Sequence, residues 1–171
     1  MDASALRNLQ TPIKDKYRAD PEAAVITLRA QGTLDDQHIA CKVETGRALA
    51  VAGLHPATGG SGAELCSGDM LLEALVACAG VTLKAVATAL EIPLRRGEVK
   101  AEGDLDFRGT LGVDKAAPVG FKAIRLTFAI DTDAPQEKID QLLKLTERYC
   151  VVFQTLQNSP KTDVRLNIVK N

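Results

Sequence analysis

The stretch Cys66–Leu90, CSGDMLLEALVACAGVTLKAVATAL, limits the possible folds more than any other part of the 171-residue chain. After Asp69 its only charged residues are Glu73 and Lys84, so a helix here would be apolar on nearly all sides and would have to be covered on most of them. At about 1.5 Å per residue, such a helix is roughly 30 Å long. The longest charge-free run, 74–83, is half of the roughly 20 residues that a bilayer requires. We therefore expect a buried helix and no membrane span.

The rest of the chain predicts an α+β domain around this helix. Polar and apolar residues alternate in six short segments, which predicts strands near 25–30, 39–44, 47–51, 99–107, 124–130 and 164–168. We place a turn at Gln31–Gly32 and an antiparallel hairpin across the loop at 109–118. Pro135 suits the first position of a second helix, which apolar spacing extends to Phe153.

Two domain-level expectations follow from this order of elements. Residues 23–171 form one domain of antiparallel sheets packed around the long central helix, and residues 1–22 form an N-terminal arm whose short helical piece ends at Pro12. Because a single six-stranded sheet cannot cover so apolar a helix, we expect a second subunit to supply the missing wall, which predicts a homodimer.

Charge and cysteine spacing exclude several classes of function. The net charge is −1 and the charges are interspersed, so we expect neither nucleic acid nor an anionic membrane as a partner. The first 20 residues contain no apolar run, so we expect no signal peptide and a cytoplasmic protein with reduced thiols. The four cysteines are widely spaced and there are only two histidines, so we expect no metal site and no cofactor.

Cys78, in the middle of the central helix, is the main candidate for chemistry. On a helix it lies in an apolar groove with one hydroxyl, formed by Ala74, Leu75, Val81 and Thr82. One interpretation is a small buried hydrophobic residue, and the other is a nucleophile whose thiolate needs a cation. Arg47 is the candidate cation, because it has the same strand parity as Leu49 and Val51 and so points inward with them.

The other three cysteines differ in their surroundings. Cys150 lies on the inner stripe of the second long helix and could meet Cys78, as a peroxidatic and a resolving thiol must. Cys41 alternates with apolar strand residues and is interpreted as core. Cys66 ends the Gly- and Ser-rich loop 52–68, whose length suits a lid or substrate loop, and it stands where a helix dipole would lower its pKa. Ser67 or Asp69 is expected to cap the helix.

Two segments together resemble a known family. DMLLEALVACAGVTL, followed 72 residues after its cysteine by RYCVVFQTLQNSP, is similar to the two motifs of the OsmC/Ohr family of osmotically inducible and organic hydroperoxide resistance proteins. The resemblance covers roughly residues 23–170 and implies an intertwined α+β homodimer with its long central helices packed back to back. It also implies a thiol peroxidase in which Cys78 attacks a hydroperoxide, Cys150 resolves the sulfenic acid as a disulfide, and a dithiol such as a lipoylated protein restores both thiols.

Other family positions have less direct counterparts in this chain. The family's catalytic arginine corresponds best to Arg47, with Arg29 as the second choice, and the acidic partner to Asp69. Nine residues at about 100° each place Asp69 half a turn from Cys78, so it would act through the cap, through the arginine or across the dimer. Glu73 is the competing acid, at about 140° from Cys78. The chain departs from the family motif where Val151, and not proline, follows Cys150.

Three hypotheses for function remain open at this point. The first is a cysteine-based peroxidase for small organic hydroperoxides. The second is a non-catalytic, stress-associated protein of the same fold that binds an apolar small molecule at the dimer interface, with both thiols serving as packing. The third is redox sensing through Cys66.

Overall fold

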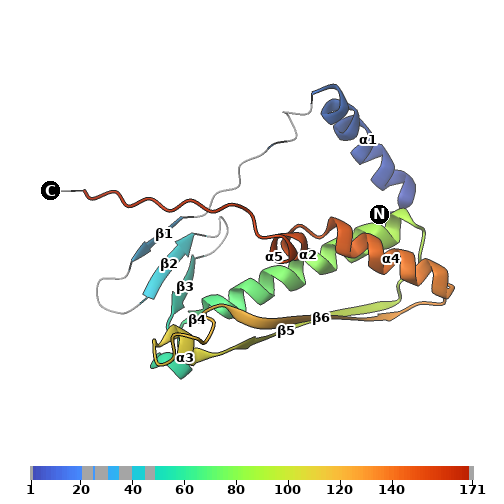
Figure 1. The fold of residues 1–171 in the computed structure, drawn as a ribbon. Helices are drawn as coiled ribbons and strands as arrows, with labels where there is room; N and C mark the ends of the chain where they lie inside the picture. The colour runs from blue at the N-terminus through green and yellow to red at the C-terminus, as the bar shows by residue number, and fades with distance from the viewer. Residues whose placement is uncertain (1, 21–24, 26–30, 35–39, 45–48, 170–171) are drawn as a thin grey trace.

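The computed structural model describes residues 2–20, 25, 31–34, 40–44 and 49–169. Figure 1 shows helices and strands in a mixed arrangement, in agreement with the predicted α+β class. In chain order the elements are α1 (Ala3–Ala19), β1 (Gln31–Leu34), β2 (Ala40–Glu44), β3 (Leu49–Gly53), the 3-10 turn η2 (Pro56–Thr58), β4 (Leu65–Cys66), α2 (Ser67–Ala89), β5 (Arg96–Leu105), α3 (Phe107–Thr110), β6 (Phe121–Asp131), α4 (Gln136–Tyr149) and α5 (Val151–Gln157).

The 23-residue helix α2 forms where the apolar stretch predicted it. Its buried residues recur every fourth position and so make a single stripe along one side: Leu75, Ala79, Leu83 and Ala87. On another side Val81 is 73% exposed, although the helix is apolar there as well. One subunit therefore covers only part of α2, and the second subunit that would cover the rest stays a prediction.

By length and composition alone, α2 is also able to cross a membrane. Its most apolar window has a mean hydropathy of 1.8 and is 22% buried. The length of the charge-free run therefore does not exclude a membrane span, because a membrane-spanning helix can contain two charged residues. The same properties belong to core helices of water-soluble proteins, so this finding is weak support for a membrane location.

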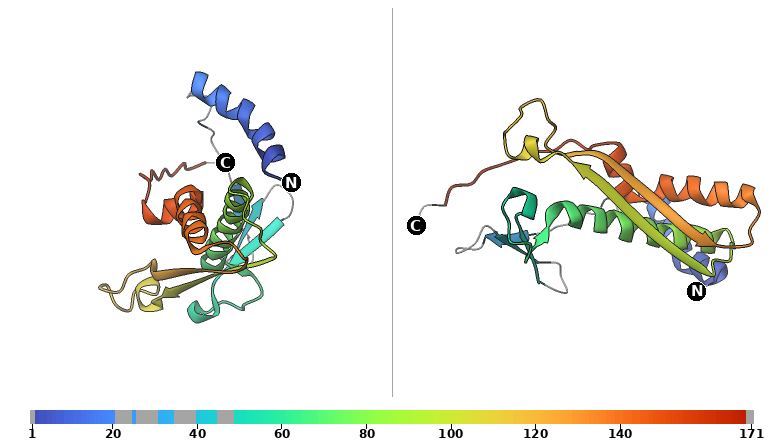
Figure 2. Two further views of the ribbon diagram at one scale, coloured as in Figure 1. Left: turned by 90° about the vertical axis from the view of Figure 1, so that its right-hand side faces the viewer. Right: turned by 90° about the horizontal axis from the view of Figure 1, so that it is seen from below.

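Strands β5 and β6 form the predicted antiparallel hairpin, and the helices pack on one face of it. Val99 pairs with Phe128 and Ala101 with Leu126, so the apolar side chains of both strands share one face. Gly103 leaves room for the ring of Phe121, because a Cβ at this position would lie 2.4 Å from the ring and the ring would have to move. In Figure 2 the helices α2, α4 and α5 all lie on one side of this hairpin.

The core between the helices and the hairpin divides into two clusters along α2. One centres on Leu83, Ala87, Ile92 and Leu142, near the carboxyl end of α2. The other centres on Leu75, Ala79 and Cys150, and partly buried residues of β5, β6 and α5 pack around it. The second cluster contains the thiols discussed below.

The described strands form two sheets. The first four make a separate sheet in the order β1-β2-β3-β4, in which β4 runs parallel to β3, and β5 and β6 make a two-stranded sheet. Sequence alternation does not show which strands pair, because each strand carries only its own pattern. The expected turn at Gln31–Gly32 is wrong, because β1 begins there. Most of the strand expected at 25–30 lies outside the described residues.

Both ends of the chain also differ from expectation. Helix α1 continues through Pro12, because a proline removes one helical hydrogen bond and need not end a helix, and Asp2 caps its start through a 2.8 Å bond from the Ala5 amide. The strand expected at 164–168 is absent from the described structure. Its side chains are largely exposed, since no strand of the described chain pairs with it, and Val164 is 92% exposed.

Candidate active site

The structure brings the two predicted thiols together. Cys78 lies at the middle of α2, partly exposed, and packs against the cluster of Leu75, Ala79 and Cys150. Cys150 is 1% exposed and is one of the buried residues against which Cys78 packs. Two cysteines that are 72 positions apart in the sequence therefore share one apolar site, with the more accessible thiol on α2 and the buried one beyond it.

Cys150 stands at a break between two helices, where the sequence predicted one continuous helix. Its backbone is extended, with φ −74° and ψ 105°, so it ends α4 and begins α5. Its amide donates to the carbonyl of Thr146 at 3.0 Å, and its carbonyl accepts from the amide of Gln154 at 2.9 Å. The break leaves the first amides of α5 without helical acceptors and places them beside the thiols.

These amides set the ionisation of Cys78. Burial on its own raises the pKa of this thiol. Hydrogen bonds to the sulfur outweigh burial and hold the pKa below the ordinary value of 9.0; they come from the Val152 amide, the Cys150 thiol, the Val151 amide and the Thr82 hydroxyl. Cys78 is therefore the thiol that ionises first, and it needs no charged neighbour among the described residues to do so.

The pKa of Cys150 moves in the opposite direction. Burial raises it, and the hydrogen bond shared with Cys78 and the charge of the Cys78 thiolate raise it further. Amides of Phe153 and Val152 only partly offset these effects. The pair therefore consists of a partly exposed thiol that loses its proton first and a buried thiol that keeps its proton to higher pH.

The predicted acids do not reach Cys78 in the single chain. Asp69 and Glu73 are both exposed and line one shallow hollow on another side of α2, with a volume of about 470 Å³. No hydrogen bond or ion pair joins either carboxylate to another described residue. Arg47 and Arg29, the candidate cations, lie outside the described residues. Their roles remain predictions.

Cys66 lies apart from the thiol pair. It is the N-cap residue of α2 and makes no side-chain capping bond, so the expected caps Ser67 and Asp69 are wrong. Cys78 lies twelve positions further along the chain, about 18 Å along a helix. Cys66 lines a cavity of about 380 Å³ beside His55, whose ring stacks on Phe107 with centroids 4.9 Å apart. The long loop before it holds η2 and β4.

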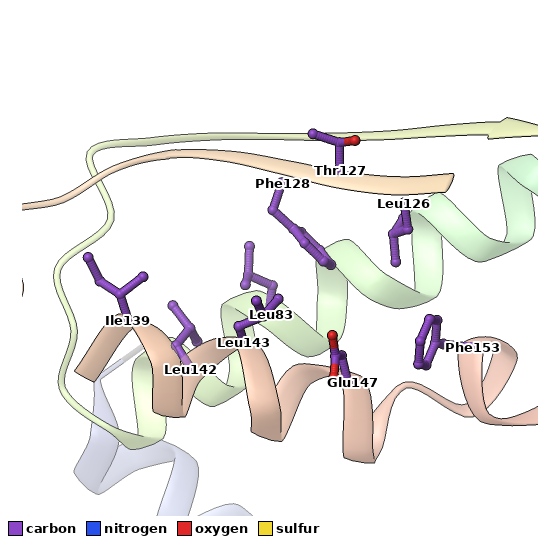
Figure 3. Close-up of a pocket in the computed structure, with 9 residues that line it drawn as sticks. All are labelled: Leu83, Leu126, Thr127, Phe128, Ile139, Leu142, Leu143, Glu147 and Phe153. Atoms are coloured by element: carbon purple, nitrogen blue, oxygen red, sulfur yellow. The ribbon is translucent and has the colours of Figure 1, made fainter. Parts of the chain in front are cut away.

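Two apolar cavities adjoin the thiol cluster. The larger, of about 550 Å³, lies between the start of α2, β6 and α5, with Lys122 at its rim. The smaller, of about 340 Å³, lies between α4 and β6, and Figure 3 shows Glu147 as its only charged lining residue. Leu126 and Phe153 line both cavities and also pack in the cluster around Cys150. An apolar molecule therefore has room beside residues of the thiol cluster, although Cys78 and Cys150 line neither cavity.

Sequence reasoning missed the amides of Val151 and Val152 as functional groups. Backbone donors carry no residue-type signal, and no glycine or proline marks the break at Cys150. The sequence signal closest to these donors was Cys150, which lies near the end of the apolar stripe of the second long helix. Within the described residues, no three His, Cys, Asp or Glu side chains gather as a metal site would require.

Comparisons with known proteins agree with this architecture. The family model described as OsmC-like protein matches residues 60–165, and no curated protein matches the chain in sequence. The OsmC-like protein of Mycoplasma pneumoniae is similar in structure, with a TM-score of 0.64, 17% identity and coverage of 78% of this chain and 89% of that one. An organic hydroperoxide resistance protein OsmC from Legionella pneumophila has a TM-score of 0.60, 18% identity and coverage of 78% and 91%.

A third similar structure is an organic hydroperoxide resistance protein from Elizabethkingia anophelis, with a TM-score of 0.62, 15% identity and coverage of 79% of this chain and 91% of that one. Identities this low show a shared fold and do not transfer an activity. The family match spans more than half of the chain and includes both Cys78 and Cys150. This chain belongs to the OsmC-like family.

Proposed function

We propose that this protein is a cysteine-based peroxidase that reduces organic hydroperoxides, with Cys78 as the nucleophile and Cys150 as the resolving thiol. The observation that carries the proposal is the pairing of the two thiols in one apolar site with pKa values displaced in opposite directions. The accessible thiol is the one whose thiolate is stabilised. The buried thiol keeps its proton until the first has reacted.

The reaction proceeds in three balanced steps. The Cys78 thiolate attacks the distal oxygen of the hydroperoxide, the O–O bond breaks, and the alkoxide leaves and takes up a proton as the alcohol. Cys78 is now a sulfenic acid, and the Cys150 sulfur attacks it to form a disulfide with loss of water. A dithiol then reduces the disulfide by thiol exchange, and both cysteines return to the thiol state while the dithiol is oxidised.

Several parts of the proposal rest on the sequence. We assign Arg47 as the cation near the thiolate and Asp69 or Glu73 as the acid that orients it. Because both acids lie exposed on another side of α2, we place them at the interface of a homodimer, where the partly covered α2 helices meet. A lipoylated protein is the proposed source of the dithiol, and the cytoplasm is the proposed compartment.

The apolar residues of the thiol cluster favour organic hydroperoxides over hydrogen peroxide as substrates. Together with Cys78, aliphatic and aromatic side chains of β5, β6 and α5 pack against the buried cluster of Leu75, Ala79 and Cys150: Val99, Ala101, Ile124, Leu126, Phe128, Val152, Phe153 and Leu156. An alkyl or aryl hydroperoxide buries apolar surface against them, at about 25 cal/mol per Å², whereas hydrogen peroxide has none to bury. We therefore expect cumene hydroperoxide to react faster than hydrogen peroxide.

The test measures peroxide consumption by the purified protein. Without a reductant, one equivalent of cumene hydroperoxide per subunit should disappear, and peptide mass spectrometry should then find a Cys78–Cys150 disulfide. With dihydrolipoamide the consumption should turn over. Cys150→Ser should still consume one equivalent but stop at a sulfenic acid that dimedone traps.

The matched control is Cys66→Ser, which removes a thiol that lies outside the pair and should change neither stoichiometry nor product. If Cys78→Ser consumes peroxide as fast as the native protein, Cys78 is not the nucleophile and the proposal fails.

The second candidate, binding of an apolar small molecule, is favoured by the 550 Å³ cavity, whose lining includes Leu75 and Phe153 of the thiol cluster. Lys122 at its rim suits an anionic head group. A fluorescent fatty acid that binds native protein and Cys78→Ser with equal affinity, in a protein that forms no disulfide under mild peroxide, would support this candidate instead.

A further inference from the structure

The cavity of about 380 Å³ at the start of α2 has no part in the proposed reaction. Its walls come from four stretches of the chain: the loop after β3, the first turn of α2, the segment around α3 and the start of β6. Figure 1 shows α3 close to β4, where these stretches meet. The cavity shares Leu71 and Phe121 with the 550 Å³ cavity, whereas Cys66 and His55 line it and not the larger one.

The inner wall of this cavity is apolar. A Cβ built on Gly68 would lie 3.5 Å from Leu105, 3.5 Å from the ring of Phe121 and 3.6 Å from the sulfur of Cys66, so these three side chains converge on one point. The described residues that line the cavity include no Asp, Glu, Lys or Arg. An ion inside would lose its water without gaining an opposite charge, so the walls favour a neutral ligand.

His55 supplies a directed polar group in this apolar setting. The amide of Ala57 donates a 3.0 Å hydrogen bond to Nδ1 of His55, so in the neutral imidazole the proton is on Nε2. The ring is held flat against Phe107, with centroids 4.9 Å apart and planes 19° apart. Nδ1 is therefore already used, and Nε2–H is the group of this ring that can donate to a ligand.

We propose that this cavity is a second binding site, for a neutral molecule that consists of one aromatic ring and a carbonyl oxygen. The ring of the ligand packs on the apolar wall beside Phe107 and Phe121, and the carbonyl accepts from Nε2–H of His55. The volume is near the lower end of the roughly 300–1,000 Å³ that is typical of ligand sites, so it suits a single ring with a short substituent. The inference does not rest on the proposed peroxidase function.

The test uses acetophenone as the probe and benzoate as its charged counterpart of similar size and shape. Binding to the full-length protein is measured at pH 8 by saturation-transfer NMR, without peroxide. We expect acetophenone to bind at least tenfold more tightly than benzoate, because benzoate would bury a charge without a partner. Equal binding of the two probes, or no binding of acetophenone at millimolar concentration, would overturn the inference.

Cysteine alkylation then identifies the cavity that the probe occupies. Acetophenone at saturation should slow the reaction of Cys66 with iodoacetamide, since Cys66 lines this cavity, and leave the rate at Cys78 unchanged in the same sample. Peptide mass spectrometry measures both rates. Protection of Cys78 in place of Cys66 would place the probe at the thiol cluster and refute the proposed site.

Two tryptophan variants in the loop between α3 and β6 form a matched pair. Val119 lines the cavity and is 64% exposed, so Val119→Trp should obstruct the cavity and weaken acetophenone binding at least tenfold. Val113, which is 73% exposed and does not line it, is the control, and Val113→Trp should bind as the native protein does. Equal binding by both variants would contradict the proposal. If Val119→Trp fails to fold by circular dichroism, Thr110→Trp, which lines the cavity, against Leu111→Trp, which does not, answers the same question.

His55→Asn tests the donor. Asparagine is also a favourable N-cap residue, so its side-chain oxygen can accept the Ala57 amide in place of Nδ1 and preserve the turn. The variant loses the ring and its Nε2–H, and acetophenone should bind about tenfold more weakly. Unchanged affinity would exclude His55 from the site. Because no step of this test uses peroxide, a protein that lacks peroxidase activity can still confirm the second site, and an active peroxidase can still refute it.

Discussion

The amide of Val151 is a donor that can be removed without disturbing the helix that holds it. Val151 is the first helical residue of α5, where an amide has no helical acceptor and where proline is well tolerated. The residue before it, Cys150, already has the extended backbone that proline requires of its predecessor. Val151→Pro should therefore keep α5 folded and delete one hydrogen bond to the Cys78 sulfur.

The size of the effect follows from the structure. A hydrogen bond to a charged group contributes about 1.5–3 kcal/mol. The lower end applies here, because Cys78 is partly exposed to water and the Val152 amide and the Cys150 thiol contribute more than Val151 does. Since 1.36 kcal/mol corresponds to a factor of ten in ionisation, alkylation of Cys78 at pH 7 should be about tenfold slower.

The assay is the iodoacetamide profile against pH, with Val151→Ala as the control. The Val151 side chain is 69% exposed, so alanine removes little packing and retains the amide. Val151→Pro should be slower than Val151→Ala at neutral pH, equal to it at high pH and similar to it in thermal midpoint. If the two variants have the same profile and both fold, the amide does not stabilise the thiolate and the account of the site is wrong.

Three further predictions concern stability and assembly. Leu75→Ala should lower the free energy of unfolding by about 3 kcal/mol, because Leu75 is 1% exposed in the thiol cluster. Leu71→Ala should lower it by less than about 1 kcal/mol, because Leu71 lines the same cavity but is 37% exposed. Denaturant titration of both variants at one protein concentration measures the difference. Because the pKa of Cys78 is lowered in the folded state, the folded protein loses this proton at a lower pH than the unfolded chain. The stability of the native protein relative to Cys78→Ala should therefore rise with pH up to the ordinary pKa of 9.0. A difference in thermal midpoint that stays flat or falls with pH would contradict this. Val81→Lys should weaken the proposed dimer in sedimentation experiments, since Val81 is 73% exposed on α2 and a charge there opposes burial; an unchanged dimer would exclude that face from the interface.

Sequence patterns predicted the parts of the fold in which a long run of residues repeats one period. The apolar stretch defined α2, the alternation around Val99 and Phe128 defined the β5–β6 hairpin, and the apolar stripe defined most of α4. In each case the pattern is local and many residues support it. The same reasoning placed Cys78 and Cys150 on inward faces, and the structure brings them into contact.

What the sequence did not predict depends on partners or on single backbone angles. The alternation at 164–168 is genuine, yet a strand also needs an edge to pair with, and no described strand offers one to Val164. The break at Cys150 depends on one ψ angle of 105°, which no glycine or proline indicates. The backbone donors that the break exposes can therefore not be identified from residue types alone.

The contact between Cys78 and the start of α5 also has a consequence for protein synthesis. The donors that stabilise the Cys78 thiolate come from residues 150–152, and α5 is the last helix of the described chain to leave the ribosome. Until α5 docks, these donors are absent and nothing described holds the pKa of Cys78 below the ordinary value of 9.0. If Cys78 is the nucleophile that we propose, its reactivity is thus a property of the finished fold, because a chain in which α5 has not docked lacks the donors that stabilise the thiolate.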